Sequence, residues 1–164
     1  MALAKGSKRV QLREMQFKSH MEQALTEARK AAERGEVPVG AVLVAPDGSV
    51  LASTGNRTRE LHDPTAHAEI LAIREACKTL GNERLTGCDL YVTLEPCPMC
   101  ASAISQARIA RVYYGASDPK SGGVAQGPRV FDHAQSHHTP EVYDGIAAEA
   151  CEALLKDFFA NRRG

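Results

Sequence analysis

Residues 89–100 read DLYVTLEPCPMC, a mostly apolar run followed at once by a Pro-Cys-Pro-Met-Cys segment. The apolar part, residues 89–94, predicts a strand buried on both faces. A helix is predicted over residues 98–107, so Cys97 and Cys100 stand at its start, three residues apart and on one face. The positive end of the helix dipole favours thiolate there, and thiolate is the form of cysteine that binds metal.

A second candidate motif, His67-Ala68-Glu69, lies upstream. Asp63 and Pro64 predict a helix that ends at Leu80, with Asp63 as its N-cap and Pro64 at its first position. His67 and Glu69 would then lie in the first turn and a half. The buried stripe predicted for this helix is Ala66, Ile70, Ile73, Cys77 and Leu80.

One imidazole, two thiols and a spare carboxylate are the components of a catalytic zinc site. Such a site takes three protein ligands and leaves the fourth position to water. The two predicted helix starts can meet at one end of a sheet, where clefts of open α/β sheets lie. The sequence therefore predicts zinc ligands at His67, Cys97 and Cys100, with Glu69 unliganded.

Two other interpretations of these motifs stay open on the residues alone. A lone Cys-x-x-Cys between a strand and a helix is also typical of thioredoxin-like redox proteins. A structural zinc site would need a fourth ligand. The candidates for that ligand are His62, Cys77, Cys88, His133, His137 and His138. The co-occurrence of H-x-E with P-C-x-x-C favours a catalytic site, because together they form the signature of zinc nucleobase deaminases.

The remaining pattern predicts an α/β fold. A hairpin turn joins two apolar strands, and an α-helical crossover makes a later strand parallel to residues 89–94. Helices are predicted over residues 19–34 and 146–161, a helical piece over 130–134, and strands over 39–45, 50–54, 109–115 and 141–144. The last helix has a predicted stripe of Ile146, Ala150, Leu154 and Phe158. We therefore expect a three-layer α/β/α sandwich around a central mixed five-stranded sheet.

Length and composition favour one ordinary globular domain. The chain has 164 residues, 43% of them hydrophobic, and no apolar run long enough for a membrane span. We predict a single domain over residues 19–164 and a disordered basic extension over residues 1–18. Five cysteines do not form a disulfide framework, so we expect a reducing, cytoplasmic location. The zero net charge is not that of a general nucleic-acid binder, although it leaves room for a local basic patch.

Beyond the zinc motif, the sequence resembles the bacterial tRNA adenosine deaminases over about residues 20–163. The segments that carry the resemblance are 36–44, 55–57, 62–70, 90–97, 108–116 and the tail from 137 to 163. The resemblance implies a cytidine-deaminase-like fold and a homodimer. It also implies hydrolytic deamination of adenosine to inosine at the wobble position of a tRNA anticodon stem-loop.

The family also implies roles for particular residues. His67, Cys97 and Cys100 would hold one zinc ion per subunit, and Glu69 would shuttle protons. Substrate contacts would come from Asn56, Ala68, Arg57, Phe158, Phe159, Arg162 and Arg163. Of the adjacent phenylalanines, we expect one to pack inward and the other to offer a stacking surface for a splayed base.

Two rival functions share these motifs. A guanine or other free-base deaminase of the same fold would have the same zinc residues. We prefer the tRNA enzyme because a pocket for a small base has no need of a basic, aromatic C-terminal helix. A non-enzymatic zinc or RNA-binding module is the second rival, and it would not depend on Glu69.

Overall fold

The computed structural model describes residues 20–163, apart from the side chain of Arg163. Its centre is a sheet in the order β2-β1-β3-β4-β5. The strands are β1 (Gly40–Val44), β2 (Val50–Gly55), β3 (Asp89–Leu94), β4 (Arg111–Ala116) and β5 (Glu141–Tyr143). β1 is antiparallel to both β2 and β3, whereas β3, β4 and β5 are parallel. The prediction of a mixed five-stranded sheet, with a β1–β2 hairpin and a parallel crossover, is confirmed.

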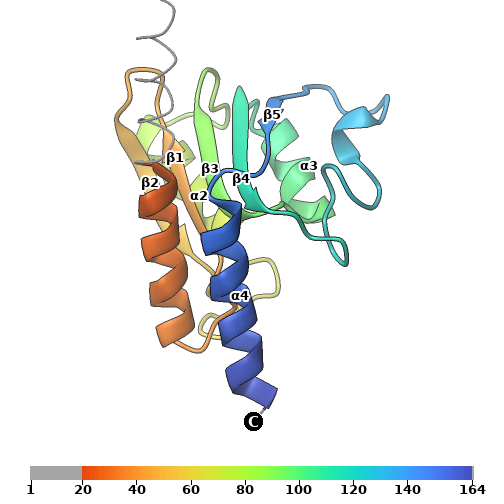
Figure 1. The fold of residues 1–164 in the computed structure, drawn as a ribbon. Helices are drawn as coiled ribbons and strands as arrows, with labels where there is room; N and C mark the ends of the chain where they lie inside the picture. The colour runs from red at the N-terminus through yellow and green to blue at the C-terminus, as the bar shows by residue number, and fades with distance from the viewer. Residues whose placement is uncertain (1–19, 164) are drawn as a thin grey trace, which may run out of the picture.

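Helices cover both faces of this sheet (Figure 1). The helix over residues 20–33 and α4 (Ala148–Arg163) lie side by side on one face. Helices α2 (Ala68–Leu80) and α3 (Pro98–Gln106) cover the other. Each face has its own cluster of buried apolar side chains. The protein is therefore the expected three-layer α/β/α sandwich.

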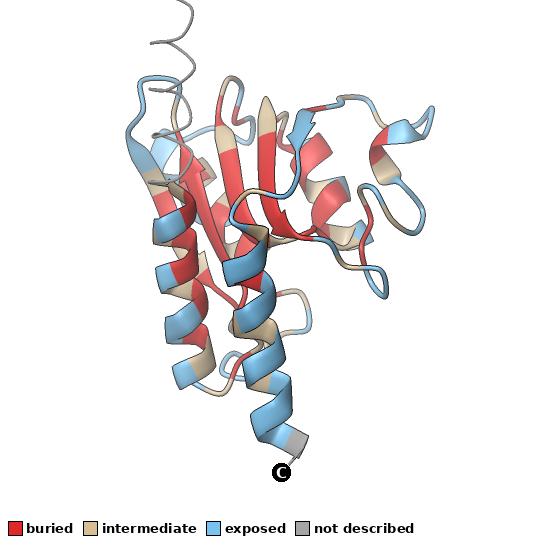
Figure 2. Ribbon diagram, in the orientation of Figure 1, coloured by how far each residue is buried: buried red, intermediate tan, exposed pale blue. Residues whose placement is uncertain are grey.

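The close approach of the first helix to the sheet depends on Gly40. A Cβ atom at Gly40 would lie 1.9 Å from the carbonyl oxygen of Ala24 in that helix. All five residues of β1 are buried, as predicted for a strand covered on both faces. Burial follows the layers, and α4 leaves most of its outward surface to solvent (Figure 2).

The predicted start of α2 is wrong by four residues. The helix begins at Ala68 with His67 as its N-cap, because the Asp63 carboxylate instead accepts hydrogen bonds from the backbone N–H and the hydroxyl of Thr65 at 2.8 and 2.7 Å. Such a local turn competes with helix formation. The predicted stripe is also wrong in part. The buried residues of α2 are Ala68, Glu69, Ala72 and Ala76, whereas Leu80 is 46% exposed.

Two details of α4 also differ from the prediction. The helix starts at Ala148 rather than Ile146, and Cys151 is buried while the predicted Ala150 is exposed. The short helical piece is confirmed as a 3-10 turn, η1 (Val130–Asp132). Residues 1–18 lie outside the described part of the chain. In the part that is described, no helix is long and apolar enough to cross a membrane.

Candidate metal centre and base pocket

The two sequence motifs meet because each begins a helix on the same face of the sheet. His67 is the N-cap of α2 and Cys97 is the N-cap of α3, both with extended backbone. Proline at the first position of α3 fits a helix start, because its missing N–H would lack an intrahelical partner there. Helices α2 and α3 contact each other, and the side chains of their N-cap residues, His67 and Cys97, lie 3.6 Å apart.

Three donor atoms converge at these helix starts. The Nδ1 atom of His67 lies 3.6 Å from Sγ of Cys97 and 3.4 Å from Sγ of Cys100. All three donor atoms lie within 4.8 Å of one another. Zinc bonds of about 2.3 Å to sulfur and about 2.0 Å to nitrogen, at tetrahedral angles, require N···S separations of about 3.5 Å. The spacing of the donors therefore fits one zinc ion per chain.

The pKa values of the two thiols also favour the binding of a metal cation between them. The pKa of Cys97 is lowered to about 4, chiefly by a hydrogen bond from Cys100 and also by the hydrogen bond with His67. The same contact with Cys97, together with burial, raises the pKa of Cys100. The pKa of His67 is raised, chiefly by its hydrogen bond to Cys97. When a metal ion binds to two sulfurs and an imidazole that share protons in this way, the protons are released to solvent.

Glu69 lies beside the three donors without being one of them. Its side chain is 4% exposed, and burial raises the pKa of its carboxyl group. The carboxyl group interacts with the Cys100 thiol and with the charges of His67 and Cys97. Among the described residues, the metal-binding group consists of His67, Cys97 and Cys100 alone. A buried carboxyl group with a raised pKa is suited to exchange protons near neutral pH.

Asn56 is fixed next to this centre by the start of α2. Its Oδ1 atom accepts the backbone N–H of Ala68 at 2.8 Å, and its own N–H donates to the carbonyl of Val39 at 3.1 Å. The carbonyl of Ala68 accepts the Thr54 hydroxyl at 2.7 Å. The Asn56 side chain is therefore held against the start of α2 by the backbone of Ala68.

A pocket of about 240 Å³ unites these residues. Asn56, His67, Glu69 and Cys97 all line it, so the structure brings together the predicted base contact, the proton shuttle and two of the metal ligands. The rest of the lining is Val37, Val39, Thr58, Leu94, Glu95, Asp118 and Ser121. We call this space the base pocket.

The predicted RNA contacts lie outside the base pocket. Arg57 forms an ion pair with Glu60 at 2.6 Å, and both side chains are partly exposed. Phe158 is half-buried beneath the Arg162 guanidinium, which stands 4.5 Å from its ring centroid. Phe159 is 45% exposed and meets Phe158 edge-on. Phe158 is thus the more buried ring and Phe159 faces solvent, as predicted, but Phe158 packs against Arg162 rather than within either buried apolar cluster.

Arg162 also links α4 to the loop that borders the base pocket. Its guanidinium donates to the carbonyl of Gly35, which accepts a second hydrogen bond from Arg59 at 3.4 Å. The C-terminal half of α4 is thereby held at the same end of the molecule as residues 57–60. The side chain of the predicted contact Arg163 lies outside the described part of the chain.

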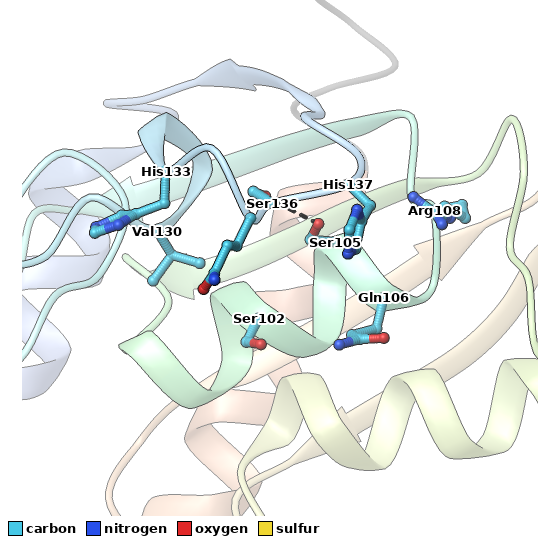
Figure 3. Close-up of a pocket in the computed structure, with 9 residues that line it drawn as sticks. Ser102, Ser105, Gln106, Arg108, Val130, His133, Ser136 and His137 are labelled. Carbon is cyan, nitrogen blue, oxygen red and sulfur yellow. Dashed lines mark hydrogen bonds between the residues drawn. The ribbon is translucent and has the colours of Figure 1, made fainter.

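The alternative fourth ligands do not join the metal centre. Residues of α3 and of the segment 130–137 enclose a separate cavity of about 360 Å³ (Figure 3). His133 and His137 line that cavity, and Nε2 of His138 donates a hydrogen bond to the carbonyl of Ile109 at 2.6 Å. Within the described residues no fourth side chain completes the cluster, which is the arrangement of a catalytic rather than a structural zinc site.

Two glutamates near the base pocket are buried, and the sequence did not identify either as a site residue. Glu36 is 1% exposed and accepts the backbone N–H groups of Arg59 and Glu60 at 2.9 and 3.3 Å. Glu95 is 2% exposed and receives hydrogen bonds from residues 117–126. Each glutamate stands one or two residues before a proline, at the edge of an apolar segment. That position only weakly indicates a buried glutamate, because the loops to which the two side chains bond lie more than 20 residues further along the chain.

The fold and the donor set define a class of proteins, the zinc-dependent deaminases. Residues 15–116 match the family described as the cytidine and deoxycytidylate deaminase zinc-binding region. The tRNA-specific adenosine deaminase of Agrobacterium fabrum is 62% identical over 143 residues, which are 87% of this chain and 93% of that protein. The chain belongs to the family of tRNA-specific adenosine deaminases.

Solved structures agree with this assignment. A structure from studies of A-to-I editing by tRNA:A34 deaminases at the wobble position of transfer RNA is 62% identical, with a TM-score of 0.82. The match covers 84% of this chain and 99% of that one. The guanine deaminase of Bacillus subtilis is 36% identical, with a TM-score of 0.60 and coverage of 89% and 93%. The resemblance seen in the sequence is confirmed.

Proposed function

We propose that this protein deaminates adenosine to inosine at the wobble position of a tRNA anticodon. The observation that carries the proposal is a zinc-type donor set beside a buried carboxyl group and Asn56, in a chain 62% identical to a tRNA-specific adenosine deaminase. The substrate is an anticodon stem-loop with the target base splayed from the loop. Enzymes that act on a base take it out of the stack and into a pocket.

The side chains of the base pocket have distinct tasks. His67, Cys97 and Cys100 hold the zinc ion, which when bound lowers the pKa of a water ligand from about 15.7 to about 7. Glu69 takes a proton from the attacking water and passes it to a ring nitrogen of adenine. It then takes the second proton, from the new hydroxyl on the attacked carbon, and delivers it to the amino group, which leaves as ammonia. The Nδ2 amide of Asn56 donates to an acceptor on the purine edge. The Ala68 N–H holds Asn56 in the orientation that this contact needs.

The contacts outside the pocket bind the rest of the RNA. Arg57, Arg162 and Arg163 face phosphates near the target base, and Phe159 stacks on a splayed base of the loop. The support for these roles is the exposure of Phe159 and the attachment of α4 to the loop at residues 57–60. Residues 1–18 are an extension of a single catalytic domain, residues 19–164.

The assembly and the location follow the family resemblance. The enzyme is a homodimer in the cytoplasm, where tRNA substrates are found. A molar mass by light scattering near twice 17.7 kDa supports the dimer, and a mass near 17.7 kDa rejects it.

A direct assay tests the function. The purified protein is incubated with an anticodon stem-loop that carries adenosine at the wobble position and, separately, with guanine. We expect conversion of that adenosine to inosine, measured by mass spectrometry of the digested RNA, and no turnover when guanosine replaces the adenosine. Turnover of guanine with none of the RNA would reject the tRNA function in favour of free-base deamination, to which the 36% identity with a guanine deaminase points.

The two phenylalanines of α4 should respond differently to truncation. Phe159→Ala removes an exposed ring, so we expect a KM for the stem-loop about 5- to 150-fold higher, which corresponds to about 1–3 kcal/mol of base stacking. Its melting temperature should stay that of the wild type. Phe158→Ala removes a half-buried ring that packs under Arg162 and should lower the melting temperature. Equal effects of both variants on KM and on stability would refute the division of roles.

A further inference from the structure

Glu95 is a buried acid for which the mechanism above has no use. It follows β3 directly, and its backbone N–H extends the strand by donating to the carbonyl of Ala116 at 2.8 Å. The metal ligand Cys97 is two residues further along. The side chain is only 2% exposed, yet it lines the base pocket. A carboxylate in such a place must be compensated by hydrogen bonds.

Within residues 20–163, the hydrogen bonds to the Glu95 carboxylate come from the segment 117–126. Oε1 of Glu95 accepts the hydroxyl of Ser117 and the N–H of Asp118, and Oε2 accepts three consecutive N–H groups. The donors lie at 3.3 Å (Ser117), 3.1 Å (Asp118), 3.1 Å (Val124), 2.9 Å (Ala125) and 3.0 Å (Gln126). Hydrogen bonds to an ionised acceptor are roughly twice as strong as neutral ones. One side chain therefore fixes both ends of a loop.

The held loop lies directly on the turn that carries Cys97. The N–H of Gly123 donates to the carbonyl of Pro96 at 2.8 Å. A Cβ atom at Gly123 would stand 2.5 Å from the backbone nitrogen of Pro98, so only glycine allows this approach. From the same loop, Asp118 and Ser121 line the base pocket. The loop is thus one wall of the pocket.

We propose that Glu95 is a positioning residue that holds residues 117–126 as a wall of the base pocket and thereby controls how tightly the target base is bound. The proposal rests on the deaminase function proposed above. Glu95 is not one of the metal-binding donors and both of its carboxylate oxygens are bonded to the loop, so its effect should fall on KM rather than on kcat. The geometry gives a sharp test, because the loop offers the side chain only donors. A glutamine would replace one acceptor oxygen by an N–H₂ donor, which cannot accept hydrogen bonds from these groups.

The test compares Glu95→Gln with the wild type in the stem-loop assay. We expect one zinc ion per chain, a kcat within about threefold of the wild type, and a KM raised at least about tenfold, the effect of a loss near 1.4 kcal/mol. Trypsin should cleave faster after Lys120, an exposed residue of the loop. The matched control is Glu83→Gln, an exposed glutamate in the α2–β3 connection, which should behave as the wild type.

A second variant perturbs the same contact from the loop. A Cβ atom at Gly122 would lie 2.6 Å from the Glu95 carboxylate, so Gly122→Ala should raise KM in the same way and leave zinc in place. This variant decides the matter if Glu95→Gln does not fold.

Three outcomes would overturn the proposal. The first is a wild-type KM together with wild-type cleavage at Lys120, and the second is a fall in kcat at constant KM. The third is loss of zinc from either variant, which would mean that Glu95 supports the turn that carries the metal ligand Cys97. Failure of the proposed function is recognised separately, because the unaltered enzyme would then leave the stem-loop unreacted. The KM comparison would then be made with guanine.

Discussion

Glu69→Gln is expected to lower kcat for the stem-loop by about 10²- to 10⁴-fold, the usual contribution of general acid–base catalysis. Glutamine fills the same volume but cannot take up or deliver a proton. The protein should still contain one zinc ion per chain, because Glu69 lies outside the group of donors at 3.4 and 3.6 Å. Single-turnover rates and metal analysis of the same preparation provide the measurement.

Two comparisons make this result specific. Glu75→Gln changes an exposed glutamate on the same helix and should keep the wild-type rate. A Glu69→Gln protein that deaminates at the wild-type rate would remove Glu69 from the mechanism and would favour a binding module over an enzyme. Loss of zinc together with activity would instead make Glu69 a part of the metal site.

Cys100→Ser is expected to abolish both zinc binding and activity. The Cys100 side chain is fully buried and its sulfur lies 3.4 Å from His67 Nδ1, so the variant keeps only two of the three protein ligands. Zinc content should fall well below one ion per chain. Because a ligand that binds only the folded state stabilises it, by about 4 kcal/mol at 1,000 times its Kd, the melting temperature should fall too. Metal analysis and thermal unfolding measure these effects.

The wild type and a third cysteine serve as controls for this prediction. Removal of zinc from the wild type with a chelator should produce the same loss of activity, and added zinc should restore it. Cys77→Ser alters a half-buried cysteine of α2 outside the metal centre and should retain zinc. A Cys100→Ser protein with a full complement of zinc would contradict the ligand assignment. A disulfide between Cys97 and Cys100 in the wild type would revive the redox interpretation.

Hydrogen bonds connect the metal centre to the residues that surround the base pocket. The metal ligands lie on two helix starts, and Asn56 is bonded to the first of them. Glu36 and Glu95 then fix the two loops that border the pocket. Backbone N–H groups provide most of the donors in these loops. Variants at the two glutamates therefore test the shape of the pocket, whereas variants at Glu69 and Cys100 test its chemistry.

The sequence predicted those features that depend on neighbouring residues. The apolar run of β1, the turn before β2 and the strand–helix step at residues 89–106 are local patterns, and all were confirmed. The approach of His67 to Cys97 and Cys100 was also predicted, because both motifs stand at helix starts. Short segments of sequence were thus enough to predict the zinc donors.

Two features of α2 were predicted wrongly, one because of a local hydrogen bond and the other because of how the helix packs on the sheet. The start of α2 moved from Pro64 to Ala68 because the Asp63 side chain bonds to Thr65. The buried face of α2 is made of small alanines that let the helix approach the sheet, and a count of large apolar residues favoured Leu80 instead.

By itself, the sequence determined the chemistry of this protein, since a few residues at fixed spacing specify the zinc donors and the acid. Only the tertiary structure decided which residues surround the pocket. Glu95 became recognisable when a loop 22 to 31 residues away closed over it. Likewise, the difference between a half-buried Phe158 and an exposed Phe159 depends on Arg162, which covers the Phe158 ring and bonds to the carbonyl of Gly35. The physical reason is that buried charge and stacking are properties of an environment, which forms only when distant parts of the chain fold together.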